Sequence, residues 1–289
     1  MRISLVFWIF FLLIATTQAQ DTAIVRNDYA LAVQEAKAGK KVVLAILDSE
    51  DLELPATMDA ALVENLIGLL CDNCHLTHFP KGLETCLNLS AVEINWYLFS
   101  DSPDNRPLLE QLFQVPHLEQ LTIHAFPLPD VPFKSRALQR LEWTKGDLMV
   151  VPAWVYEQTK LKSLRLGCNN LTRIDEALGN LTALEYFSLG GGACGGNPIK
   201  SLPQSLKQLT QLKAFDLSYA HLQTLPSAFW ELPNLERLSF HYAGLVTLPD
   251  DIPTGTALRS FRLSATEEFL GFPPSFCQLT TRTPLCRCV

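Results

Sequence analysis

Apolar residues recur along most of the chain with a rhythm that fits neither a continuous helix nor a continuous strand. In residues 235–253, LERLSFHYAGLVTLPDDIP, the apolar positions are Leu235, Leu238, Phe240, Leu245, Leu248 and Ile252. Their spacings are three, two, five, three and four residues, whereas an amphipathic helix repeats its apolar positions every three or four. Alternation typical of a strand covers only the first few positions. The pattern predicts a short strand followed by an irregular return to the next strand.

The same frame recurs with a period of 23 residues. Three further copies read LKSLRLGCNNLTRIDEALGNLTA from Leu161, LKAFDLSYAHLQTLPSAFWELPN from Leu212 and LRSFRLSATEEFLGFPPSFCQLT from Leu258. The copy from Leu184 has five extra residues, and earlier copies start at Leu138, Leu118, Leu89 and Leu66, with a degenerate one near Lys41. Ten units in register cover nearly the whole chain, and this predicts a repeat architecture.

This frame resembles the leucine-rich-repeat family, in the class written LxxLxLxxNxLxxLPxxLxxLxx, over residues 41–280. The resemblance implies an α/β solenoid, an arc of about ten coils with a parallel sheet on its concave side. Positions 1, 4 and 6 of each unit supply the inner side of a strand, and positions 11, 14, 18 and 21 fill the rest of the interior. Stacked coils about 4.8 Å apart pair their strands and bury one continuous core, which a single coil cannot do.

Position 9 departs from the family pattern. The resemblance places an Asn there, whose amide satisfies backbone groups in the turn between coils. From the second unit onward only Asn169 and Asn197 occupy this position. We therefore expect a broken asparagine ladder, with the least regular stretch at residues 89–137, where units of odd length carry Tyr97 and Phe126 at position 9.

The two ends of the chain differ from the repeats. Residues 1–19, MRISLVFWIFFLLIATTQA, have the basic start, short apolar run and small-residue site of an export signal. Residues 20–40 predict an N-terminal capping helix, begun by Asn27 or Asp28, with Leu31, Ala32 and Val33 inward. Residues 281–289 are expected to form a Cys-containing C-terminal cap, whose Cys286 or Cys288 could bond Cys277.

Composition narrows the classes of function. The net charge is −7, which disfavours a nucleic-acid partner. No apolar run after the first segment approaches the 18 residues of a membrane span. Together with the export signal, this predicts a secreted or periplasmic protein, in which disulfides can form. No cofactor and no metal is expected, and no enzyme signature appears. Asn88, Asn170 and Asn180 match the N-glycosylation pattern, and whether any of them carries a glycan stays open.

Two cysteine patterns suggest chemistry. Cys71, Cys74 and His75 match the C-x-x-C-H motif of covalent haem attachment, the basis of an alternative redox or haem-binding function. Cys71 and Cys74 also fall at inward positions of the repeat, as core cysteines would. The insertion GGGACGGN brings Cys194 near Cys168 of the previous coil, so that a disulfide between them could fix the inserted loop.

In such a coil positions 3, 5, 7 and 8 point out of the concave sheet, where family members usually bind their partners. The strongest candidate cluster there combines aromatic and basic residues, the types that dominate interface energetics: Tyr219, Tyr242, His241, Arg237 and Arg262. Trp96 with His124 is a second candidate. The sequence thus predicts a non-enzymatic exported protein that recognises a protein or peptide. A self-associating structural component of the envelope or surface is the other alternative.

Overall fold

A computed structural model describes the chain over residues 21–47, 54–72, 80–95, 106–127, 129, 131–191, 194–222, 224–225, 229–248, 257–264 and 269–271. The chain divides into two compact units. Unit 1 comprises Met1–Leu118 with Pro129–Ser135, and unit 2 comprises Glu119–Leu128 with Arg136–Val289. The division falls inside residues 89–137, the stretch expected to be least regular.

Unit 1 is a parallel sheet with helical connections. Its elements in chain order are β1 Thr22–Arg26, α2 Tyr29–Lys37, β2 Lys41–Leu47, α3 Ala60–Asn65, β3 Leu66–Asp72, the 3₁₀ turn η1 Leu83–Thr85, β4 Ala91–Asn95 and α4 Arg106–Phe113. The strands pair in sequence order, β1 with β2, β2 with β3 and β3 with β4. Helix α4 lies in the unit that is six residues longer than the repeat, so the extra length forms a true helix instead of a 3₁₀ turn.

The helix expected within residues 27–40 is present as α2, with the Asp28 carboxylate accepting a hydrogen bond from the Leu31 backbone N–H at 2.8 Å. A strand, β1, precedes it and pairs with β2, which the repeat frame did not indicate. Helix α2 therefore connects two neighbouring strands. Its buried residues are Ala32 and Ala36, whereas Leu31 is 40% exposed, so the inward placement of Leu31 was wrong.

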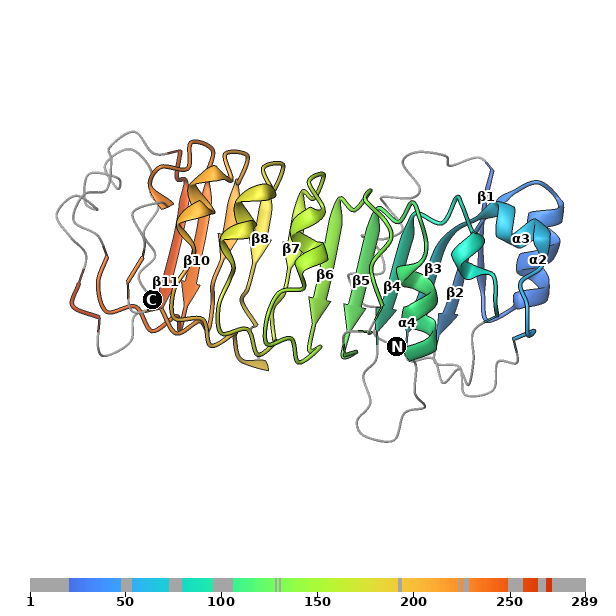
Figure 1. Cartoon of the computed structure of the whole chain (residues 1–289), viewed down its shortest axis with the longest axis horizontal. Helices are drawn as coiled ribbons and strands as arrows, with labels where there is room; N and C mark the ends of the chain where they lie inside the picture. The colour runs from blue at the N-terminus through green and yellow to red at the C-terminus, as the bar shows by residue number, and fades with distance from the viewer. Residues whose placement is uncertain are drawn as a thin grey trace. The chain divides into compact units, whose positions relative to one another are not determined.

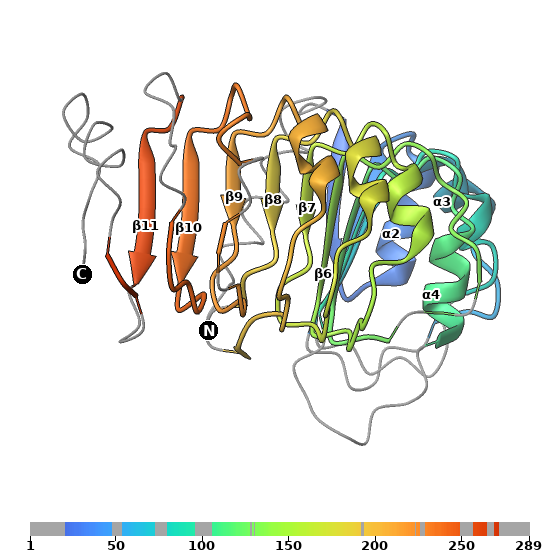
Figure 2. The same cartoon turned by 60° about the vertical axis from the view of Figure 1, so that its left-hand side comes forward.

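Unit 2 contains one strand per repeat. Its strands are β5 Gln120–His124, β6 Arg140–Thr144, β7 Ser163–Arg165, β8 Tyr186–Ser188, β9 Ala214–Asp216, β10 Arg237–His241 and β11 Ser260–Ser264. Each pairs in parallel with the next, so that residues at equal repeat positions lie side by side, as Ser239 does with Arg262. Figure 2 shows strands β6 to β11 next to one another in chain order.

The two faces of this sheet differ. The 3₁₀ turns η2 Ala153–Glu157, η3 Glu176–Asn180 and η5 Gln204–Gln208 lie on one face (Figure 1). None of these three turns lies on the other face, which we call the open face.

The interior of unit 2 follows the predicted positions. In the unit starting at Leu161, the side chains at positions 1, 4, 6 and 11 are at most 1% exposed. Aromatic rings at position 4 or 6 of successive coils extend the core, with centroids 5.0 Å apart for Phe187 and Phe215 and 6.0 Å apart for Phe240 and Phe261. The prediction of an α/β solenoid with a parallel sheet is confirmed. The described residues contain eleven strands, one more than the ten predicted coils, because of β1.

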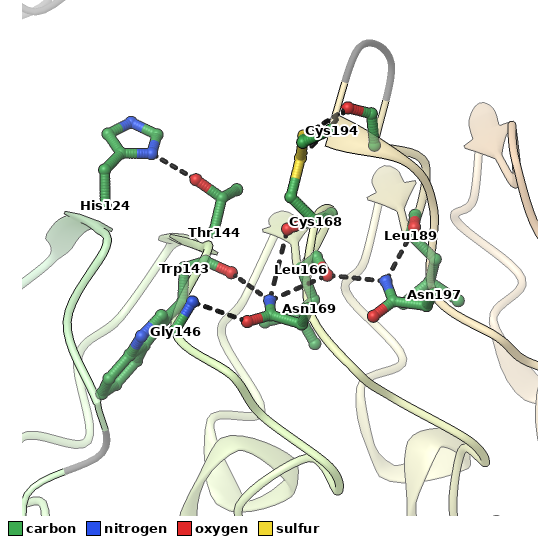
Figure 3. Close-up of a disulfide and its surroundings, with 12 residues drawn as sticks. His124, Trp143, Thr144, Gly146, Leu166, Cys168, Asn169, Leu189, Cys194 and Asn197 are labelled. Carbon is green, nitrogen blue, oxygen red and sulfur yellow. Dashed lines mark hydrogen bonds between the residues drawn. A yellow bond between two sulfur atoms is a disulfide. The ribbon is translucent and has the colours of Figure 1, made fainter. Parts of the chain in front are cut away.

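The two position-9 asparagines hold successive turns together (Figure 3). The Asn169 side-chain oxygen accepts from the Gly146 N–H at 2.9 Å, and its amide nitrogen donates to the carbonyl oxygens of Trp143 and Leu166 at 2.8 and 3.0 Å. Asn197 donates to the carbonyl oxygens of Leu166 and Leu189, each at 2.8 Å. Both side chains are at most 4% exposed. Each asparagine therefore satisfies backbone groups of more than one coil.

A tryptophan side chain bonds the backbone of the preceding coil where position 9 is not asparagine. Position 9 is Phe126 in one coil and Gly146 in the next, and the indole N–H of Trp143 donates to the Phe126 carbonyl oxygen at 3.0 Å. A Cβ on Gly146 would overlap the Trp143 ring and the Phe126 carbonyl. The absence of a side chain at position 146 thus makes room for an indole that performs part of the role of an asparagine.

The residue at position 8, just after the strand, bends the backbone in five coils. Positive φ angles occur in unit 2 at this position in Ala125 (63°), Lys145 (57°), Cys168 (56°), Tyr219 (64°) and Tyr242 (51°). Non-glycine residues adopt this left-handed region at a cost of about 1 kcal/mol or more. The repeated turn therefore imposes a strained conformation on both tyrosines of the predicted binding cluster.

Candidate functional site

A shallow groove of about 210 Å³ lies on the open face across β8 to β11. Its lining residues are Tyr186, Ala214, Phe215, Asp216, Arg237, Leu238, Ser239, Ser260 and Arg262. The groove exists because Ala214 occupies position 3 of β9, where the neighbouring strands carry Tyr186 and Arg237. A small side chain between two large ones leaves a depression that a ligand side chain can enter.

The acidic group in the groove is already bonded within the chain. One carboxylate oxygen of Asp216 accepts from the backbone N–H and the hydroxyl of Ser218, at 3.0 and 2.6 Å. The other accepts from the hydroxyl of Ser188 at 3.3 Å. These bonds fix the carboxylate against the sheet. They leave Asp216 with little capacity to accept hydrogen bonds from a ligand.

Two arginines border the same groove from adjacent strands. Arg237 is at repeat position 3 in β10, and Arg262 is at repeat position 5 in β11. The two residues are therefore diagonal neighbours on adjacent strands, a distance that long side chains can bridge. Arg237 contacts Glu236 at 3.7 Å with its side chain 60% exposed. Arg262 is exposed and forms no ion pair among the described residues. The guanidinium donors of this pair are therefore available to an anionic ligand.

Tyr219 and Tyr242 lie together beyond the groove, at the strand ends. Their ring centroids are 5.3 Å apart with an interplanar angle of 34°. Tyr242 is 59% exposed although it is a large aromatic residue. The pair offers an exposed, preordered aromatic surface of the kind found in interface anchors.

Both candidate histidines bond a hydroxyl in the following coil. The Nδ1 atom of His241 is 2.7 Å from the Ser264 hydroxyl, and the Nδ1 atom of His124 pairs in the same way with Thr144. The same arrangement at two distant coils is a feature of the repeat, and it orients each ring. Burial lowers the pKa of His124, against the opposing effect of the Glu142 carboxylate 3.9 Å away, and Lys145 lowers it further.

A second basic cluster lies on the open face at β6 and β7. Arg165 contacts Glu142 at 3.7 Å, and its guanidinium carbon lies 4.7 Å from the centre of the Tyr186 ring, a cation–π contact. Arg140 occupies position 3 of the neighbouring strand. Burial lowers the Arg140 pKa, and the positive charge of Arg165 lowers it further. One carboxylate, Glu142, thus contacts both Arg165 and His124.

A disulfide closes the inserted loop above this sheet. Cys168 and Cys194 are bonded, with Cα atoms 5.6 Å apart at a sequence separation of 26 residues (Figure 3). The pairing suggested by the sequence is therefore present. It anchors the five-residue insertion to the coil before it, next to Asn197.

Solved structures that resemble this chain are built from leucine-rich repeats. The Leptospira interrogans leucine-rich-repeat protein LIC12759 superposes with a TM-score of 0.53 at 21% sequence identity, over 86% of this chain and 60% of that one. The fold is that of a leucine-rich-repeat solenoid. Internalin C2 from Listeria monocytogenes is also similar, with a TM-score of 0.48 at 19% identity over 64% of this chain and 75% of that one. No known protein-family model matches the sequence, and no curated protein does so either.

The chain thus matches 60% of the length of the Leptospira protein. At this level of identity the resemblance establishes the fold alone. In the part of the chain that the structure describes, no helix is long and apolar enough to cross a membrane. Within the same residues, no group of three or more His, Cys, Asp and Glu side chains is arranged to hold a metal ion.

Several predicted positions fall outside the described residues. They are the export signal at residues 1–19, Trp96, the haem-motif residues Cys74 and His75, the cysteines Cys277, Cys286 and Cys288, and the cap at 281–289. Cys71, the first residue of the haem motif, lies in β3 with 1% exposure and a free thiol. Cys86 is likewise buried and free. Burial of this kind favours core cysteines in the repeat interior.

The structure adds residues that the sequence did not single out. Tyr186, Ala214 and Arg140 occupy position 3 of their coils, and Asp216 and Glu142 occupy position 5 with bonds to neighbouring coils. Tyr186, Ala214 and Arg140 could have been found by comparing the residues at position 3 of successive repeats. The bonds of Asp216 and Glu142 depend on side-chain orientation, and no spacing in the sequence reveals them.

Proposed function

We propose that this chain is an exported, non-enzymatic leucine-rich-repeat protein that recognises a protein or peptide on the open face of unit 2. The observation that supports it best is the combination, within four adjacent strands, of a groove, two available arginines and an exposed tyrosine pair. The side chains are held by a continuous sheet and by bonds between coils. Binding therefore loses little conformational entropy in the recognition surface.

The turn at position 8 places the two tyrosines side by side. Tyr219 and Tyr242 keep left-handed backbone conformations that Gly or Asn would adopt at lower cost. The same conformation occurs at position 8 in Ala125, Lys145 and Cys168, so the strain belongs to the repeated turn, and it is the exposed aromatic pair that supports the proposal. Export is proposed from the N-terminal sequence, and the Cys168–Cys194 disulfide is compatible with an oxidising compartment.

The test compares capture by three immobilised forms of the chain, each without residues 1–19. The first is the wild type, the second carries Tyr219→Ala with Tyr242→Ala, and the third carries Met149→Ala with Val150→Ala. Met149 and Val150 are exposed apolar residues away from the groove. Proteins from the secreted or periplasmic fraction that bind the wild type and the third form, and are lost from the second, support the proposal. Equal capture by all three forms contradicts it.

A further inference from the structure

The open face of unit 2 has a charge opposite to that of the whole chain. At positions 3, 5, 7 and 8 of the described coils from β5 to β11, the basic residues are Arg140, Lys145, Arg165, Arg237 and Arg262. The acidic residues at these positions are Glu142 and Asp216. The face thus has five basic residues against two acidic ones, on a chain whose net charge is −7. The adjacent position-2 row does not cancel this excess, because its three acidic residues are matched by three basic ones, Lys162, Lys213 and Arg259.

Both acidic residues of the face are engaged within the chain. Asp216 accepts three hydrogen bonds from Ser188 and Ser218. Glu142 lies between His124 and Arg165. Arg140 lies on the strand next to that of Arg165, so two guanidinium groups share this part of the face. A ligand approaching this face therefore meets arginine donors, and carboxylates that are already occupied by neighbouring side chains.

The positive charge is concentrated at two places. One is the pair Arg140 and Arg165 on β6 and β7, and the other is the pair Arg237 and Arg262 on β10 and β11. Three strand spacings separate β7 from β10, or roughly 14 Å at the usual spacing of parallel strands. The groove with Tyr186 and Ala214 lies between the two pairs.

We propose that the open face binds an extended acidic segment of a polypeptide partner, with two carboxylates four to five residues apart. One carboxylate bonds Arg237 and Arg262, where planar guanidinium groups suit a carboxylate. The other bonds Arg140 and Arg165, and the chain between them crosses the groove. This inference rests on the proposed function, because it specifies the chemistry of the partner at that same face.

The spacing allows a direct test with short peptides capped at both ends. In the hexapeptide EPPPPE, the polyproline conformation of the four central prolines places the two glutamates about 16 Å apart. Calorimetric titration at low ionic strength should show saturable binding of this peptide, at least tenfold weaker binding of EPE and of QPPPPQ, and none of KPPPPK. Equal binding of the glutamine peptide, or tighter binding of a ten-nucleotide oligothymidylate, would overturn the proposal.

Charge reversal supplies the matched control. The variant Arg237→Glu with Arg262→Glu should bind EPPPPE at least tenfold more weakly than the wild type. Lys160→Glu with Lys207→Glu changes the net charge equally, at exposed residues away from the groove, and should bind within twofold of the wild type. Circular dichroism checks that both variants are folded. If both folded variants lost the same amount of EPPPPE affinity, binding would depend only on the overall charge, and the proposal would be overturned.

The same variants separate this inference from the proposed function. If a natural partner captured through the tyrosine pair still binds the Arg237→Glu and Arg262→Glu variant, the open face is the binding site but its partner is not acidic. If no partner depends on the tyrosines and no peptide binds, both fail. Sedimentation that shows self-association, abolished by the arginine reversals, would make a second copy of this chain the occupant and would also overturn the proposal.

Discussion

The side-chain amide of Asn169 donates to the carbonyl oxygen of Trp143 at 2.8 Å, across the boundary between two coils. Its oxygen accepts from Gly146 and Leu148 on the same earlier coil, at 2.9 and 3.3 Å. One buried side chain therefore satisfies three or more backbone groups that have no access to water. With Asn197, it fixes the ends of β6, β7 and β8 relative to one another.

Replacement of this asparagine should be costly. Asn169→Ala leaves buried backbone groups unpaired and should lower the free energy of unfolding by about 3 kcal/mol. Asn170→Ala, at the adjacent exposed residue, should change it by about 0.5 kcal/mol or less. Urea unfolding of the two variants measures the difference. Equal, small effects would show that the asparagine bonds do not hold the coils together.

The left-handed turn at position 8 predicts an unusual preference for glycine. Tyr242→Gly should be about 1 kcal/mol more stable than Tyr242→Ala, because alanine has to adopt the same positive φ that glycine adopts freely. At Ser239, inside β10, the order should reverse, with Gly about 0.5–1 kcal/mol less stable than Ala. Thermal unfolding of the four variants provides the comparison. A common order at both sites contradicts the assigned backbone conformation.

The disulfide should contribute to stability through the loop that it closes. Cys168→Ala with Cys194→Ala should lower the free energy of unfolding by about 3 kcal/mol, as expected for a loop of this length. Peptide mapping without reduction should recover a linked fragment that contains both cysteines. Free thiols at both positions in the purified chain would show that the bond does not form.

The environment of His124 predicts a pH dependence of stability. Because burial lowers its pKa in the folded state, the unfolded chain binds the proton more readily. The contribution of neutral His124 to the free energy of unfolding is therefore fully present above the unfolded pKa of about 6.5. It is lost as the pH falls through the lower pKa of the folded state. The free energy of unfolding should decrease less between pH 7.5 and 5.5 in His124→Gln than in the wild type. Identical pH profiles would contradict the placement of this ring.

The fold could be predicted from the sequence because one period of 23 residues repeats with leucine at the same inward positions. The same frame also predicts Tyr219 beside Tyr242 and Cys168 near Cys194. It did not indicate β1, since Thr22–Arg26 lies outside the repeat and is recognisable only by its pairing with β2. Nor did it indicate that Trp143 substitutes for an asparagine, because this bond needs the space above Gly146.

The candidate site was predicted in part. The aromatic and basic residues lie at the outward-facing positions of the repeat. Positions 5 and 8 of these coils hold both basic residues, such as Arg165 and Lys145, and the acidic residues Glu142 and Asp216. The positive excess emerges once position 3 is included and the bonds of Glu142 and Asp216 are known. The groove depends on the difference in size between Ala214 and its neighbours, which matters only when their strands lie side by side.

The most direct test of the account is where a bound partner touches the solenoid. A photo-crosslinking amino acid at Ser239, in the groove, should form a covalent product with the captured partner, and salt at about 0.5 M should reduce it strongly. The same probe at Asn180, at the end of η3 on the opposite face, should form none. Products from Asn180 and none from Ser239 would contradict recognition on the open face.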